Sequence, residues 1–167
     1  MSGASTSLMD RMKGAAMLDI DTFEAVEHDT GATLQAAMVV VLASVAGAVG
    51  SWNLGIGSAL GAAVASLLSW GVWAGVTYLI GDKLLGGTAT WGELLRTIGF
   101  AYSPAVLLVL AILPVVGAAI SVVVAIWVLI AVVIAIRQAL DFSTGKAVLT
   151  AVLGWLPYGF IMAMLRY

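Results

Sequence analysis

The chain has 167 residues, of which 62% are hydrophobic and 10% charged, and its net charge is −2. Soluble domains carry about 25% charged residues, so this composition excludes an ordinary soluble protein and predicts an integral membrane protein. The lack of cysteine excludes disulfides, thiolate chemistry and Cys-ligated metal, and the weak negative charge gives no reason to expect nucleic acid as a partner.

Residues 1–32 are predicted to form a cytoplasmic head with short helices. Residues 1–7 are small and polar and are predicted to be disordered, with no removable signal peptide. A short amphipathic helix on the membrane surface is predicted next, with a frayed polar terminus as the alternative. Arg11 and Lys13 lie off its apolar face, which holds Leu8, Met9, Met12 and Ala16.

A second short helix is predicted to begin at Asp21, an N-cap residue with Glu24 three positions later. Its apolar edge is Phe23 and Val26, and the single histidine, His28, is predicted to be solvated at its end. The head holds six acidic residues and two basic ones. We therefore predict that it folds back over basic cytoplasmic loops, with the apolar edge filling a groove between helix ends; a mobile acidic tail is the alternative.

The first membrane span is predicted at 33–52, with a tryptophan at its far end, and the second at 58–80, ending at Gly81-Asp82-Lys83. Small residues recur every four positions along the second span, which makes one helix face smooth. We predict that this face packs within the bundle, and a dimerisation seam between two copies is the alternative. The face consists of Gly57, Gly61, Ala65 and Ser69.

A polar stretch precedes the third span. Thr90 and Glu93 form a capping box, so a helix is predicted along the membrane interface before it enters the bilayer. A break or restart of this helix is predicted at Tyr102, Ser103 and Pro104. Such a break is either a simple kink or a substrate site. In a kink, the carbonyl group that loses its N–H donor forms a hydrogen bond with a nearby group instead.

No charged side chain occurs between Arg96 and Arg137, a stretch long enough to cross a bilayer twice. We predict a helical hairpin with spans at 98–116 and 119–138, turned at Pro114–Gly117. A last span follows at 146–164 and is predicted to bend at Pro157. The fold class is therefore an all-α, five-span membrane bundle over residues 33–167.

The basic residues decide the predicted orientation, because cytoplasmic loops carry the excess of Lys and Arg. With five spans, one side carries a single basic residue, Arg166. The other side, which includes the N-terminus, carries Arg11, Lys13, Lys83, Arg96, Arg137 and Lys146. The N-terminus is therefore predicted to be cytoplasmic.

Three segments carry a resemblance to a known family: the acidic head at 19–29, Trp91–Pro104, and Gln138–Ala147 between the last two spans. With the five spans, they resemble the YIP1 family and its prokaryotic branch over nearly the whole chain. The resemblance implies a five-span protein with a cytoplasmic N-terminus in the prokaryotic cytoplasmic (inner) membrane. Eukaryotic relatives reside in ER and Golgi membranes and contact Rab GTPases in vesicle traffic. The short head here lacks the Asp-Leu-Tyr-Gly-Pro-like motif of many eukaryotic members, so the resemblance does not extend to a GTPase-binding role.

Apart from Arg137 and Lys146 at the span ends, the predicted spans contain no Asp, Glu, His, Lys, Arg or Cys, which argues against an enzyme, a metal or cofactor site and an ion-coupled transporter. A membrane scaffold or adaptor is the first hypothesis, with membrane lipids as partners and a homo-oligomer left open. An accessory subunit of a larger complex is the second. A passive pathway for a neutral or lipidic solute is the third, lined by Ser66, Ser69, Thr77, Tyr78, Tyr102, Ser121 and Tyr158. The candidate cytoplasmic interaction face comprises Phe23, Val26, Trp91, Arg96, Asp141 and Lys146.

Overall fold

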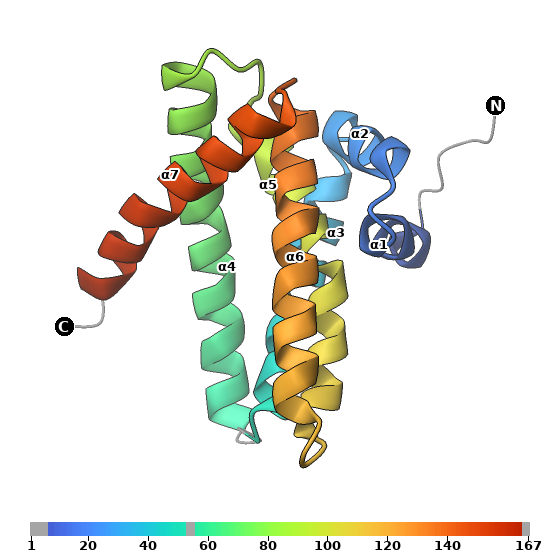
Figure 1. Ribbon diagram of the computed structural model, residues 1–167. Coiled ribbons are helices and arrows are strands. Elements are labelled where there is room, and N and C mark those ends of the chain that lie inside the picture. The colour runs from blue at the N-terminus through green and yellow to red at the C-terminus, as the bar shows by residue number, and fades with distance from the viewer. Residues whose placement is uncertain (1–6, 53–55, 165–167) are drawn as a thin grey trace.

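The computed structural model describes residues 7–52 and 56–164, and every regular element in these ranges is helical (Figure 1). The predicted all-α class is confirmed. The predicted disordered tail falls almost entirely in residues 1–6, outside the described residues. The elements are α1 (Leu8–Ala16), α2 (Ile20–His28), α3 (Ala32–Gly50), α4 (Ile56–Tyr78), the π-helix η1 (Leu79–Leu84), α5 (Trp91–Ala101), the 3₁₀-helix η2 (Ser103–Ile112), α6 (Gly117–Ala139) and α7 (Thr144–Met164).

Four described helical segments are long and apolar enough to cross a membrane: Ala32–Gly50, Leu60–Leu84, Trp91–Ile112 and Gly117–Ala139. Each overlaps one of the first four predicted spans, which makes the protein an integral, multi-pass membrane protein. The third differs most, because Trp91–Ile112 begins before the predicted 98–116 and includes the helix that was predicted to lie along the interface. The predicted fifth span falls on α7, of which Thr144–Leu156 is a shorter apolar helix. The backbone of α7 stays helical past Pro157.

The bundle core is built from α3, α5, η2 and α6, with α4 packed on α3 and α5, and α7 on α6 and α4. Figure 1 shows α7 crossing the bundle obliquely, with its C-terminal end directed away from α6. Alanine and glycine together make up most of the buried residues of α3 and of α6, which lets the helix backbones approach closely. The largest fully buried side chains of the core include Phe100, Leu94, Ile98, Ile136 and Leu140.

The second span does not end at Gly81 as predicted, because the helix continues as η1 to Leu84. Two charges in this last turn are satisfied locally: Lys83 Nζ lies 2.7 Å from Asp82 Oδ2 and 5.1 Å from the centre of the Tyr78 ring. Gly81 packs against the side chain of Leu140, where a Cβ atom would overlap it. Asp82 and Lys83 therefore lie within the helix and do not end it.

The third span breaks where predicted, but its second half is not an α-helix. After α5 ends, η2 begins at Ser103 with Pro104 in its first turn, where the missing N–H is not needed. Ser103 is not the N-cap: Tyr102 holds that position, and Ser103 Oγ donates to the Phe100 carbonyl at 2.7 Å. The freed carbonyl is thus satisfied locally. The predicted turn before α6 is also present, with Val115 fully exposed at φ 73°.

Two details of the N-terminal helices differ from the prediction. The N-cap of α2 is Asp19 instead of Asp21, and its carboxylate accepts hydrogen bonds from the Thr22 backbone N–H at 3.2 Å and hydroxyl at 2.5 Å. In α1, Arg11 is not on the outer face but is buried beside Ala15. Periodicity alone misplaced Arg11 because its polar partners are distant in sequence.

Candidate functional site

The N-terminal cap, defined as α1 and α2, is folded back against the bundle. Figure 1 shows both helices beside the bundle, and α2 contacts α5 and α6. Phe23 and Val26 have no exposed surface, and both belong to the same buried cluster as Leu94 and Ile98 of α5. The predicted fold-back is therefore present in the structure, with apolar contacts fixing its position.

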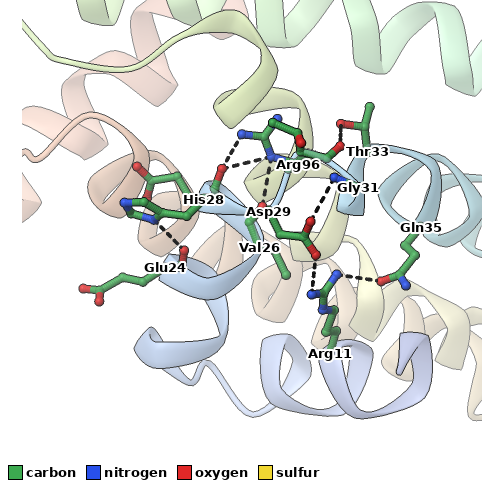
Figure 2. A network of polar contacts seen from close by, with 11 residues as sticks. Arg11, Glu24, Val26, His28, Asp29, Gly31, Thr33, Gln35 and Arg96 are labelled. Atoms are coloured by element: carbon green, nitrogen blue, oxygen red, sulfur yellow. Dashed lines mark hydrogen bonds and ion pairs between the residues drawn. The ribbon is translucent and has the colours of Figure 1, made fainter. Parts of the chain in front are cut away.

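Arg96 on α5 fastens the C-terminal end of α2 (Figure 2). Its Nε donates to the carbonyl oxygens of Val26 at 2.9 Å and Glu27 at 3.0 Å, and its Nη2 donates to the Glu27 carbonyl as well. These carbonyls lie in the last turn of α2, where intrahelical partners are missing and the helix dipole is negative. A buried guanidinium, only 5% exposed, thus caps the helix from another element.

Arg11 on α1 makes the second fastening (Figure 2). Its Nη2 lies 2.6 Å from Asp29 Oδ2, and its Nη1 donates to Gln35 Oε1 at 3.0 Å. The other oxygen of Asp29 accepts from the Gly31 backbone N–H at 2.9 Å. The hydrogen bond from Arg11 holds the pKa of Asp29 below its ordinary value. Arg11 therefore joins α1 to the turn before α3 and to α3 itself.

The six residues of the candidate interaction face do not form one open surface. Phe23, Val26 and Arg96 are buried in the contact between the N-terminal cap and the bundle. The other three lie around the loop at 85–90. Trp91 is half-exposed and donates to the Gly71 carbonyl at 3.3 Å, Asp141 accepts from Thr88 Oγ1 at 2.8 Å, and Lys146 Nζ lies 3.4 Å from the Leu85 carbonyl.

Glu27 stands where several charges meet. Burial raises the pKa of Glu27 to about 7, and the carboxylates of Glu93, Asp141 and Glu24 act in the same direction, whereas His28 lowers it. His28 is exposed, as predicted, and a hydrogen bond from its Nδ1 to the Glu24 carbonyl at 2.9 Å raises its own pKa, helped by the charge of Glu27. The end of α2 is therefore sensitive to pH near neutrality.

We expect the N-terminal cap to be held less tightly at roughly pH 8 than at pH 6. The folded-state pKa of Glu27 exceeds the ordinary 4.5, so its stabilising contribution is complete below 4.5 and disappears as the pH rises through about 7. His28 acts with the same sign, because its pKa is also raised. Asp29 has the opposite sign, but its contribution is lost only in acid.

Hydrogen exchange of residues 22–28 measures this pH effect after correction for the intrinsic exchange rate. Glu27→Gln should remove most of the dependence, and Asp21→Asn, at an exposed position of the same helix, should leave it unchanged. Solvent screening at the partly exposed Glu27 limits the size of the effect. Equal protection of α2 across this pH range would contradict the prediction.

A cavity of about 980 Å³ lies among the membrane helices, between α4 on one side and α3, η2 and α6 on the other, with α7 at one edge. Its wall carries no charged side chain. Three residues of the candidate pathway lie on it: Ser66, Ser69 and Tyr102. The full lining is Val40, Ala43, Ser44, Gly47, Ala62, Ala65, Ser66, Ser69, Trp70, Trp73, Tyr102, Ala105, Leu108, Ala125, Val128, Leu129, Val132, Ala151, Val152, Trp155 and Leu156.

The other candidate pathway residues do not join this cavity. Ser121 lines a smaller cavity of about 380 Å³, where its hydroxyl donates to the Gly117 carbonyl at 3.0 Å. Thr77 is buried and Tyr78 packs against the core, and neither lines either cavity. The side chain of Tyr158 lies outside the described residues. The seven residues therefore do not line one continuous path.

The smooth face of α4 does not pack inside the chain as predicted. A Cβ atom on Gly57 or Gly61 would meet no atom within 4 Å, whereas Ala65 and Ser69 line the cavity. Small residues at this spacing permit close packing but do not require it. Within the described part of the chain, the two glycines lie on an outer surface, and the dimerisation alternative stays open.

The comparisons with known proteins agree with the helical membrane architecture. The model of the Yip1 domain matches residues 30–165, which includes α3 to α7 and leaves the N-terminal cap just outside. No curated protein and no solved structure gives a significant match. Because the match spans most of the chain, the protein belongs to the YIP1 family of integral membrane proteins.

Proposed function

We propose that this YIP1-family protein is a non-enzymatic membrane scaffold or adaptor that crosses a prokaryotic cytoplasmic membrane five times. The observation that carries the proposal is the N-terminal cap. It is fastened to the bundle by Arg11 and Arg96, both of which are buried. A folded cap with fixed charges gives a partner a defined surface, which a mobile tail does not.

The distribution of chemistry supports the same proposal. Apart from Arg166, the Asp, Glu, His, Lys and Arg residues gather on the N-terminal cap and on the loops near 82–96 and 137–146, and the cavity wall has none of these residue types. General acid–base catalysis and ion coupling both need such groups at the reacting or transported species. Binding of a partner through an ordered surface does not need ionisable groups in the membrane cavity.

In-cell photo-crosslinking tests the adaptor role. A photoreactive amino acid is placed singly at exposed positions near the 85–90 loop, Trp91 and Asp141, and at the outer-facing control Leu60, which is 65% exposed on α4. We expect discrete protein adducts from the first two positions and lipid adducts alone from Leu60. Absence of protein adducts at both positions would contradict an adaptor. Native mass spectrometry that finds a foreign subunit in fixed stoichiometry would favour an accessory subunit instead.

The five-span topology gives a separate prediction. Single cysteines at Asn53 and at Val115, which is fully exposed in the turn before Gly117, should react with an impermeant thiol reagent in intact cells, and those at Thr88 and Ser143 should react only after the membrane is opened. The chain has no cysteine of its own, so the background is low. The physical reason is the bias of basic residues toward the side of Thr88 and Ser143. Labelling of intact cells at 88 or 143 but not at 53 would reverse the topology.

A further inference from the structure

The cavity between α4 and α6 lies at the depth of the hydrocarbon core. Its α6 wall consists of Ala125, Val128, Leu129 and Val132, which are about two turns from either end of that helix, Gly117 and Ala139. The other walls come from further membrane helices. A molecule in this cavity is therefore surrounded by the middle of the bilayer.

Two polar groups of the wall are hydrogen-bonded inside the protein. Ser44 Oγ donates to the Val41 carbonyl at 2.9 Å, and Trp70 Nε1 donates to the Leu95 carbonyl at 3.0 Å. The remaining surface is mostly alanine, valine and leucine. Such a wall favours a hydrocarbon over a polar solute, because a polar group moved there from water would lose its hydrogen bonds.

The cavity opens sideways, and its rim is exposed. Leu129, Val152, Trp155 and Leu156 line it and are each between 55% and 63% exposed. Its volume of about 980 Å³ is at the upper end of ligand pockets. The bilayer supplies hydrocarbon chains at this rim, so a lipid chain is the nearest apolar occupant.

We propose that this cavity is a binding site for the hydrocarbon chain of a membrane phospholipid, which enters from the bilayer between α4, α6 and α7. Apolar burial holds the chain, since the wall offers no charge for a headgroup. The headgroup stays outside the cavity, so the site selects for the chain and not for the headgroup. The site is distinct from the cytoplasmic surface of the proposed adaptor function.

A photoactivatable phospholipid tests the site. The full-length protein is reconstituted in vesicles of phosphatidylethanolamine and phosphatidylglycerol that contain a phosphatidylglycerol with a diazirine in the middle of one acyl chain. It is then extracted in mild detergent, washed and irradiated, so that only retained lipid reacts. We expect adducts on the wall residues Ala125, Val128 and Leu129, and few on Val123 and Ile130, which are exposed on the opposite face of α6 at a similar depth.

Two filling variants on opposite walls, Ala125→Phe and Ala62→Phe, should each lower the retained lipid about tenfold, the change given by 1.4 kcal/mol of lost binding. The matched control is Val123→Phe, which adds the same ring at an exposed position outside the cavity. Comparable thermal stability of the three variants shows that folding is intact.

Several results would overturn the proposal: no retained phospholipid in the unmodified protein, retention unchanged by both filling variants, or adducts as frequent on Val123 and Ile130 as on the wall residues. A diazirine fatty acid that is retained in place of the phospholipid would show the wrong ligand. A dimer crosslinked through the cavity residues would show that a second copy occupies the site.

Discussion

Replacing Arg96 with methionine is expected to release α2 from the bundle and to destabilise the N-terminal cap by about 2–4 kcal/mol. The variant leaves the carbonyls of Val26 and Glu27 without the donors that satisfy them, at a site where Arg96 is only 5% exposed. Hydrogen exchange of residues 22–28 should therefore become faster by more than tenfold, while exchange in α3 and α6 stays slow.

Two control variants test whether the effect is specific to the Arg96 side chain. Lys13→Met removes a positive charge from an exposed position in α1 and should leave the exchange of α2 unchanged. Arg96→Lys keeps the charge but loses the planar fork that reaches both carbonyls, so its effect should be intermediate. If Arg96→Met leaves residues 22–28 as protected as in the unmodified protein, the apolar contacts of Phe23 and Val26 and the hydrogen bonds of Arg11 hold the cap without Arg96.

The fold-back of the head was predictable, but its partners were not. Charge balance indicated that acidic residues would approach basic loops, yet Arg96 binds backbone carbonyls at the end of α2 and not a carboxylate. The one ion pair that fastens the cap in the described part of the chain, between Arg11 and Asp29, lies within the head itself. Sequence spacing cannot show that a helix end will face a guanidinium from a helix 70 residues away.

The membrane helices were predicted closely because the bilayer forces apolar segments to satisfy their own hydrogen bonds. The first span, predicted at 33–52, is Ala32–Gly50, and the fourth, predicted at 119–138, is Gly117–Ala139. The departures are the π turn of η1 and the 3₁₀ form of η2. Both elements pack against distant parts of the chain, η1 against Leu140 and η2 against α3, and local sequence does not specify such contacts.

The glycines show most clearly what a pattern can and cannot specify. The regular spacing of small residues predicts close helix packing at Gly61, which has open space around it, and not at Gly50 or Gly99. A Cβ on Gly99 would lie 2.7 Å from the Cβ of Ala36, and one on Gly50 would overlap the Leu108 carbonyl oxygen. Close helix contacts therefore depend on single glycines whose partners are on other elements.

This contrast predicts opposite outcomes for two identical substitutions. Gly50→Ala should lower the free energy of unfolding by about 1–3 kcal/mol, because the backbone of η2 must move away from α3. Gly61→Ala should be neutral or stabilise by up to about 1 kcal/mol, since alanine is the better helix former and its methyl group meets nothing within 4 Å.

Thermal unfolding in detergent measures both variants, and Gly61→Leu extends the test with a larger side chain. A Gly61→Leu variant as stable as the parent places this face on the outer surface, as the structure does. If instead Gly61→Leu is strongly destabilised while Gly50→Ala is not, the packing of α3 on η2 is wrong. A third outcome is that Gly61→Leu and Gly50→Ala are both destabilised in the membrane, but only Gly50→Ala is destabilised in monomeric detergent preparations. The smooth face of α4 would then be a contact between two copies.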